Sequence, residues 1–162
     1  MRSKIIEDRA FIVNLIYNFQ SIGKVVVLVH GTFDILRPRH IELLKKAKEL
    51  GDVLIVGVYA DEVVKAIKGP QRPLVTLSDR MTVLDGLSDI NFIIPLQHPE
   101  HEQIVSQLKP NIFIHQANSP YHLDTSDLEK YKGTIRSIEV TNEDSTTALI
   151  QKIQGTSQNE TR

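Results

Sequence analysis

The sequence predicts an α/β protein with a doubly wound, Rossmann-like parallel sheet of five strands, helices on both faces and an additional N-terminal helix. Two observations predict this class. Short apolar runs alternate along the chain with helical segments, which is the pattern of parallel strands joined by helices. The runs at 25–29 and 53–59 consist mainly of β-branched and aliphatic residues, as expected of strands buried on both faces.

Glycine and proline mark the ends of the first elements. A leading helix is expected over 5–20, followed by a turn and the first strand, which ends at Gly31. Pro38 is favoured at the first position of a helix, and the apolar stripe of the following residues continues to Gly51. We expect Gly51 to end this helix as a left-handed cap.

The later elements follow from caps and breakers in the same way. We expect a strand at 53–59, then a helix from Asp61 to about Ile67, and then a helix capped by Thr76 or Ser78 that reaches Leu87. Two further strands are expected at 91–96 and 111–115, with a helix at 100–108 between them. After a polar irregular stretch at 116–132, we expect a weak fifth strand at 134–140, a last helix at 146–153 and a disordered tail at 155–162. Residues 1–154 are expected to form one domain that includes the leading helix within 1–22.

Composition excludes several kinds of function. A formal net charge of −1 and a pI near 6.6 give no general attraction to nucleic acid or to an anionic membrane, so an anion site must be built locally. The absence of cysteine excludes disulfides, cysteine-zinc sites and thiol nucleophiles, and suits a cytoplasmic protein. The apolar stretch at 10–19 is short and interrupted by Asn14 and Asn18, so we interpret it as a core-packing helix and not as a membrane span.

The stretch from Val25 to His40 predicts a phosphate-binding corner. An apolar strand meets a glycine turn and then a helix, so free backbone N–H groups and the positive helix end point beyond the edge of the sheet. Arg37 and Arg39 flank Pro38 at this helix start. Cations there are disfavoured by about 0.3–1 kcal/mol each when nothing offsets them, which favours a bound anion. The alternative is that both side chains bend into water at small cost.

Three segments in the same order resemble the cytidylyltransferase-like nucleotidyltransferases. These segments read HGTFDILRPRH, KGPQRPLVTLSDRMTVL and DSTTALIQKI. The chain from 23 to 153 is most similar to the heptose-phosphate adenylyltransferases and more distantly to glycerol-3-phosphate cytidylyltransferase. This resemblance implies that a substrate phosphate attacks the α-phosphate of a nucleoside triphosphate and expels pyrophosphate, usually with Mg²⁺ and without a covalent enzyme intermediate.

The resemblance assigns roles to individual residues. It implies catalytic roles for His40, Arg37, Lys68 and Arg80, which would neutralise the α- and β-phosphates. It implies nucleotide binding by the turn after the first strand, by the arginine within the helix start, and by an STT element at a later helix start: Gly31, Thr32, Phe33, Asp34, Arg39, Ser145, Thr146 and Thr147.

The chain also departs from the family pattern. The family's HxGH element reads RPRH here, so that Arg37 replaces a histidine and Arg39 replaces a glycine. Arginine can clamp phosphate oxygens but cannot exchange a proton at working pH, and the Arg39 side chain enters space that the family keeps open. The Lys-Gly-Gly-Asp motif of the adenylyltransferases is replaced at 115–118 by His-Gln-Ala-Asn, which alters or removes the acceptor side.

Several of these residues have a structural alternative. Asp34 can brace the turn, Arg80 can pair with Asp79 or Asp85, and His30 can hydrogen-bond to backbone. His98 and His101 resemble a metal site in spacing but lack a third ligand, so we expect no protein-bound metal.

The sequence therefore predicts a nucleotidyltransferase that transfers an adenylyl or cytidylyl group from ATP or CTP to a small phosphorylated sugar or polyol. An alternative is a catalytically impaired relative that binds nucleotide or phosphate in a regulatory or assembly role, and a third possibility is a pure protein-interaction domain. The expected partners are the nucleoside triphosphate with Mg²⁺, the phosphorylated acceptor and, as a possible homodimer, a second copy of the chain. Nucleic acid and membrane are not expected partners.

Overall fold

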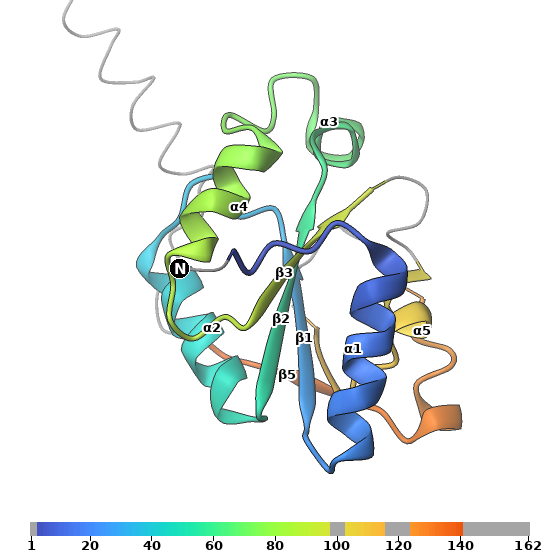
Figure 1. Cartoon of the computed structure of the whole chain (residues 1–162). Coiled ribbons are helices and arrows are strands. Elements are labelled where there is room, and N and C mark those ends of the chain that lie inside the picture. The colour runs from blue at the N-terminus through green and yellow to red at the C-terminus, as the bar shows by residue number, and fades with distance from the viewer. Residues whose placement is uncertain (1–2, 98–102, 116–123, 141–162) are drawn as a thin grey trace, which may run out of the picture.

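A parallel five-stranded sheet forms the centre of the computed structural model, which describes residues 3–97, 103–115 and 124–140. The strands lie in the order β3-β2-β1-β4-β5, and every neighbouring pair is parallel. This confirms the predicted fold class (Figure 1). The strands are β1 (Val26–Gly31), β2 (Val53–Tyr59), β3 (Phe92–Leu96), β4 (Ile112–His115) and β5 (Thr134–Ser137).

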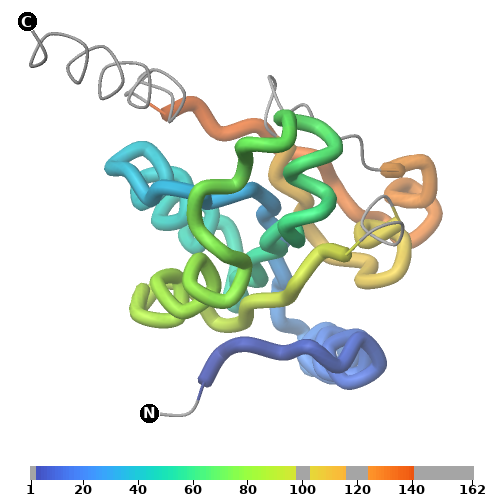
Figure 2. The backbone as a smooth tube through the Cα atoms, turned by 90° about the horizontal axis from the view of Figure 1, so that it is seen from above, coloured from blue at the N-terminus to red at the C-terminus, as the bar shows by residue number. Residues whose placement is uncertain are grey.

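Helices cover both faces of the sheet, as a doubly wound fold requires. One face packs against α1 (Arg9–Ser21), α3 (Asp61–Lys68) and α5 (Ile104–Leu108), and the other packs against α2 (Pro38–Glu49) and α4 (Leu77–Asp85). Each face has its own apolar core because alternate residues of the buried strands point to opposite sides. A short 3₁₀ helix, Glu129–Tyr131, precedes β5. Figure 2 shows the same layers from above.

The strand order places a switch point beside β1. The chain runs from β1 to β2 and β3 on one side, and then returns to β4 and β5 on the other side. The crevice between the carboxyl ends of β1 and β4 is therefore the usual ligand position in such a sheet. Gly31, at the end of β1, pairs in register with Val58 near the end of β2.

The start of the leading helix differs from the prediction. The helix begins at Arg9 and not at residue 5, because the Asp8 side chain caps it by accepting a hydrogen bond from the Phe11 N–H. Before the helix, Ile5 forms a parallel bridge with Ile93 of β3, and the Ile6 N–H donates to the Ile93 carbonyl at 2.8 Å. The apolar residues that suggested an extra helical turn instead cover the open edge of β3.

Gly51 does not adopt the predicted left-handed conformation. Gly51 is not among the described residues that have a positive φ. The residue that caps the end of α2 is Leu50, and its backbone is in the right-handed region. Glycine is needed here for space: a Cβ atom would lie 2.7 Å from Val27 Cγ2 and 2.8 Å from the Val25 carbonyl oxygen. Close packing of the chain against β1, and not a helix cap, accounts for this residue.

Other boundaries differ by a few residues. Thr76 caps α4 as predicted, but this helix ends at Asp85 and not at residue 87. The strand expected over 134–140 ends at Ser137, and Ile138 and Val140 pack against the core beneath α2. The helix predicted at 146–153 and the tail at 155–162 lie outside the described residues. No helix among the described residues is both long enough and apolar enough to cross a membrane.

Candidate functional site

The turn after β1 is built around one close contact between two of its residues. Phe33 has a φ of 50°, an uncommon conformation for a residue with a side chain. Its ring lies so close to Gly31 that a Cβ atom there would be 2.8 Å from Phe33 Cε2. Phe33 and the neighbouring Thr32 are buried, so the turn has a fixed shape. It leads directly to the start of α2.

His40 holds the start of α2 in place. Pro38 occupies the first position of the helix, and the preceding Arg37 is extended. The Arg37 N–H donates to His40 Nδ1 at 2.9 Å, and the His40 ring meets the Phe33 ring edge-on with centroids 5.8 Å apart. Because Nδ1 is an acceptor in this hydrogen bond, the proton of the neutral imidazole is on Nε2.

The surroundings of His40 favour its neutral form. Burial, together with the positive charges of Arg39, Arg37 and Lys68, lowers the pKa of His40 to about 4. At pH 7 the imidazole is therefore uncharged and offers one N–H donor at Nε2. It can hydrogen-bond a phosphate oxygen, but the charge that neutralises the phosphate must come from other residues.

Three cations supply that charge: Arg37 and Arg39 at the start of α2, and Lys68 at the end of α3. Burial, and then the charge of Arg37, lower the pKa of Arg39 at the start of α2. Burial lowers the pKa of Lys68 at the end of α3, as do the charges of Arg72 and Arg39, while Asp34 acts in the opposite direction. These side chains are close enough to repel one another, so the start of α2 and the end of α3 face one region of excess positive charge. An anion is the ligand that would stabilise this arrangement.

Asp34 braces the loop that follows α3. Its side chain is only 2% exposed and accepts a hydrogen bond from Arg72 Nε at 2.8 Å. Its Oδ1 also accepts the backbone N–H groups of Leu74 and Val75, each at 2.9 Å. The carboxylate is thus surrounded by donors from residues 72–75, which corresponds to the bracing alternative for this residue. Its predicted contact with nucleotide stays a prediction.

Arg80 lies behind the turn with its guanidinium fully buried. Arg80 Nε donates to the Val75 carbonyl at 2.9 Å, and a second nitrogen donates to the Thr32 carbonyl. The third nitrogen donates to the Tyr59 carbonyl at 2.8 Å and to Asp61 Oδ1 at 2.7 Å.

Arg80 therefore joins the end of β1, the end of β2, the start of α3 and the loop before α4. Its ion-pair partner is Asp61, and not Asp79 or Asp85 as the structural alternative expected. A contact of Arg80 with phosphate stays a prediction, while each of its three nitrogens donates to at least one protein acceptor.

The other face of the sheet edge carries a buried imidazole. His30 Nδ1 lies 2.8 Å from the Tyr59 hydroxyl, and the His30 ring stacks on Phe113 with centroids 5.3 Å apart. The Tyr59 hydroxyl is thus one hydrogen-bond partner of His30. Burial lowers the pKa of His30 to about 4, and the nearby His115 contributes in the same direction. These neutral rings are therefore buried on the face of the sheet opposite to α2.

A mainly apolar hollow of about 230 Å³ lies on the α4 side of the turn. It is lined by Phe33, Asp34, Ile35, Leu36, Val75, Arg80 and Val83. Its two charged residues, Asp34 and Arg80, are already paired with protein groups. The hollow therefore offers packing for an apolar group, whereas the cations converge at the start of α2.

The structure brings together some of the predicted site residues and does not describe others. Arg37, Arg39, His40 and Lys68 surround the start of α2, while Asp34 and Arg80 support the same region from behind. Ser145, Thr146 and Thr147 lie outside the described residues, as do 116–118, His98 and His101. Among the residues that the structure describes, no group of three His, Asp or Glu side chains could hold a metal ion.

Sequence reasoning missed two supporting residues. Tyr59 and Asp61 were treated as parts of a strand end and a helix start, yet the structure links both of them to Arg80. Their position at the carboxyl end of a buried strand was the only available signal. The pairing of Arg72 with Asp34 was also not predicted.

Comparison with known proteins relates this site to a family. The chain is 35% identical to the bifunctional protein HldE of Actinobacillus pleuropneumoniae serotype 5b (strain L20) over 134 residues, which are 82% of this chain and 28% of that protein. It is 33% identical to the bifunctional protein HldE of Syntrophotalea carbinolica over 133 residues, or 81% of this chain and 27% of that protein. The chain thus spans less than a third of the length of these relatives.

Two solved structures share the fold. The lipopolysaccharide core biosynthesis protein from Thermoplasma volcanium GSS1 aligns with a TM-score of 0.62 and 25% identity, covering 75% of this chain and all of that one. A pantoate-beta-alanine ligase from Francisella tularensis aligns with a TM-score of 0.58 over 88% of this chain and 69% of its own, and at 13% identity shows the fold alone. The cytidylyltransferase-like family model matches residues 28–156, which include most of β1, the turn and the cations around α2. The chain therefore belongs to the cytidylyltransferase-like family.

Proposed function

We propose that the protein is a nucleotidyltransferase that moves an adenylyl or cytidylyl group from a nucleoside triphosphate to a small phosphorylated sugar or polyol. The observation that carries this proposal is the convergence of Arg37, Arg39 and Lys68 around the start of α2, at the carboxyl end of β1. Membership of the cytidylyltransferase-like family supports the reaction class. Similarity to the lipopolysaccharide core biosynthesis protein supports a sugar-type acceptor.

The chemistry requires positioning and charge neutralisation but no protein nucleophile. An oxygen of the acceptor phosphate attacks the α-phosphorus, a new P–O bond forms, and the bond to the β-phosphate oxygen breaks to release pyrophosphate. Arg37 and Arg39 carry the fixed charge that stabilises the non-bridging oxygens, and Lys68 approaches from α3. His40 adds a neutral hydrogen bond through Nε2.

Magnesium fits this site as a companion of the nucleotide. The carboxylates nearest the cations, Asp34 and Asp61, are both paired with arginines, and the described residues contain no cluster of ligands for a metal ion. Mg²⁺ commonly keeps several waters and binds through substrate phosphates. It would therefore be held mainly by the phosphate oxygens of the triphosphate, where it supplies additional charge neutralisation.

Pyrophosphate release tests the proposal directly. The protein is incubated with ATP or CTP, Mg²⁺ and a panel of phosphorylated sugars and polyols, and pyrophosphate is measured by a coupled assay. We expect release that depends on one nucleotide and one acceptor class. Lys68→Ala should lower kcat/KM about 10²-fold or more because it removes a charge from the transition state. Lys45→Ala, an exposed change on α2, is the matched control. No release with any combination would contradict the proposal.

A second function is favoured by the RPRH sequence at the start of α2. Arg37 and Arg39 stand where the related enzymes carry histidine and glycine, so a protein that binds nucleotide or phosphate without turnover is the alternative. It predicts a higher melting temperature with nucleotide but no pyrophosphate release. The double substitution Arg37→His with Arg39→Gly should then create activity if the rest of the site is intact.

A further inference from the structure

Lys68 is the last residue of α3 and lies at the carboxyl edge of the sheet. Figure 1 shows α3 above the ends of the strands, and the loop that follows it is held to the turn after β1 through Asp34. Lys68 as a whole is exposed, so a small molecule can reach it. Lys65, which is also exposed, lies one turn earlier, so both lysines share one helix end.

The charges around Lys68 increase the fraction of its neutral amine. Its pKa is lowered by burial of part of the side chain and by the positive charges of Arg72, Arg39 and Arg80. Asp34 acts in the opposite direction, but its carboxylate already pairs with Arg72 at 2.8 Å. The neutral amine of a lysine is a nucleophile, whereas the protonated form is not.

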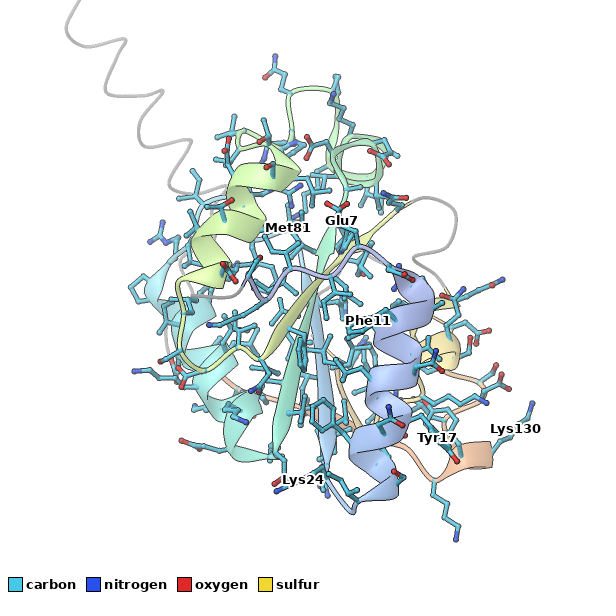
Figure 3. The ribbon with its side chains drawn as sticks, viewed as in Figure 1. Glu7, Phe11, Tyr17, Lys24, Met81 and Lys130 are labelled. Carbon is cyan, nitrogen blue, oxygen red and sulfur yellow. The ribbon has the colours of Figure 1, made fainter. Side chains whose placement is uncertain are left out.

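Two other lysines have carboxylate partners instead. Lys24 pairs with Asp52 at 2.9 Å, and Lys130 pairs with Asp127 at 2.6 Å. Figure 3 shows both lysines toward the end of the molecule opposite to α3. A neighbouring carboxylate favours the protonated ammonium form, so these two lysines are expected to react slowly as nucleophiles.

A site for an anion lies next to Lys68. Arg37 and Arg39 occupy the start of α2, where the helix N–H groups also favour negative charge. Within the part of the chain that the structure describes, the buried Arg39 Nε has no hydrogen-bond partner, which leaves a donor for a phosphate oxygen. The pKa of His40 is lowered by both arginines and by Lys68, so these three cations act on one point. A molecule whose phosphate binds there would hold its remaining atoms near the Lys68 amine.

We propose that Lys68 is a modification site that is acylated by acyl phosphates. The phosphate of the reagent binds to Arg37 and Arg39, which places the adjoining carbonyl carbon against the amine. The neutral nitrogen attacks that carbon, the C–O bond to the phosphate breaks, and phosphate leaves with the bonding electrons. The nitrogen then loses a proton to solvent and remains as an uncharged amide. This inference rests on the anion site of the proposed function but requires neither nucleotide nor turnover.

Acetyl phosphate is the probe that tests the proposal, and mass spectrometry of the digested chain reports the acetylation rate of each lysine. We expect Lys68 to be acetylated about tenfold faster than Lys65, because the bound reagent is held beside the amine. Tripolyphosphate should slow the reaction at Lys68 and leave the rate at Lys65 unchanged. Equal rates at the two lysines, or no protection by tripolyphosphate, would overturn the proposal.

A second reagent separates delivery by the anion site from the reactivity of the amine itself. p-Nitrophenyl acetate carries no phosphate, so it reports that reactivity alone. Arg37→Ala removes a charge from the anion site, whereas other arginines lower the pKa of Lys68. The ratio of the Lys68 rates with acetyl phosphate and with p-nitrophenyl acetate should therefore fall about tenfold in Arg37→Ala. Lys45→Ala, an exposed change on α2, should keep the wild-type ratio. An unchanged ratio in Arg37→Ala would contradict delivery by the site.

The affinity of the modified protein for tripolyphosphate is an independent readout. Calorimetric titration should show binding about tenfold weaker after acetylation, because the amide carries no charge. Lys68→Arg keeps the charge but offers no neutral amine, so the same treatment should leave its affinity unchanged. A similar loss in Lys68→Arg would assign the effect to other lysines and count against the proposal. None of these measurements involves pyrophosphate release, so failure of the proposed reaction and failure of this inference are observed separately.

Discussion

His40 shows how neighbouring residues determine the role of a single side chain. It lies at the start of a helix among three cations, and its Nδ1 already accepts the Arg37 N–H. A histidine in these surroundings is a neutral hydrogen-bond donor. The fixed charges of the arginines make a charged imidazole both unnecessary and unfavourable.

A bound anion should reverse this preference. In the free protein, NMR titration should show a pKa of about 4 for His40. Addition of tripolyphosphate should raise that pKa, because a nearby negative charge favours the protonated form. His30, whose pKa is also about 4 but which lies across the sheet, is the internal control and should not move. A His40 that titrates near 6.5 in the free protein would contradict this account.

The second prediction at this scale concerns the stability provided by Arg80. Arg80→Leu leaves three carbonyl groups and Asp61 without their donor. Urea unfolding should show a free energy of unfolding lowered by about 1–3 kcal/mol, the cost of leaving buried acceptors without their donor. Arg136→Leu on the exposed strand β5 should change it by less than about 0.5 kcal/mol. Equal effects from both variants would show that the Arg80 contacts contribute little.

At the scale of elements, the loop between α3 and α4 is held to the turn after β1 by the Arg72–Asp34 ion pair and by hydrogen bonds. Asp34 accepts from residues 72–75, and Arg80 donates to Val75 in the same loop. These contacts hold residues 72–75 against the turn, and Lys68 lies at the end of α3, where this loop begins.

Asp34→Asn should loosen this loop. The amide keeps one acceptor oxygen but loses its charge and one acceptor position, so the amides of Leu74 and Val75 should exchange hydrogen faster. The free energy of unfolding should fall by about 1–3 kcal/mol, as expected when buried donors lose their partner. Asp127→Asn breaks an exposed pair with Lys130 and should leave exchange at 74 and 75 unchanged. Unchanged exchange in Asp34→Asn would refute the bracing role.

Predictability from sequence also differs between elements. Strand β2 occupies 53–59 as predicted because a buried strand is an uninterrupted apolar run. Ile5 was assigned to a helix because an apolar residue near a helix looks the same whether it packs helically or pairs with β3. Gly51 was interpreted by a local rule, yet the contact that requires it is with Val25 and Val27 on a neighbouring segment.

The candidate site shows the same limit. Motif letters located the start of α2 and the lysine and arginine that flank the loop before α4. They could not reveal that Asp34 is satisfied by donors about 40 residues later, or that Arg80 pairs with Asp61, 19 residues earlier. Such partners depend on which strands and loops lie side by side in the folded protein. The periodicity of the sequence does not reveal these neighbours.

At the scale of the whole molecule, a chain with a net charge of −1 concentrates cations at one point. Binding of anions should therefore be local and sensitive to salt. Tripolyphosphate at about 100 times its dissociation constant should raise the free energy of unfolding by about 2.7 kcal/mol. At the same tripolyphosphate concentration, this increase in the free energy of unfolding should be smaller in Arg37→Ala and unchanged in Lys45→Ala. A response that is the same in all three proteins would locate the anion elsewhere.

Stability should also depend on pH through the two buried histidines. The pKa values of His30 and His40 are lowered to about 4, whereas each is about 6.5 in the unfolded chain. Between these values the unfolded chain binds more protons, so the free energy of unfolding should fall as the pH drops from 6.5 to 4. Urea midpoints across this window measure the effect. His30→Asn should flatten the slope, and an unchanged slope in this variant would contradict the burial argument.

The contact between Gly31 and Phe33 has a consequence for how this protein can be altered. The Phe33 ring occupies the volume that a side chain at position 31 would need. Residues 31 and 33 therefore cannot be substituted independently of each other. A larger residue at 31 becomes acceptable only when the ring at 33 is replaced by a smaller group. Selection for folded protein from a library randomised at positions 31 and 33 should therefore return variants in which a larger residue at 31 accompanies a smaller residue at 33.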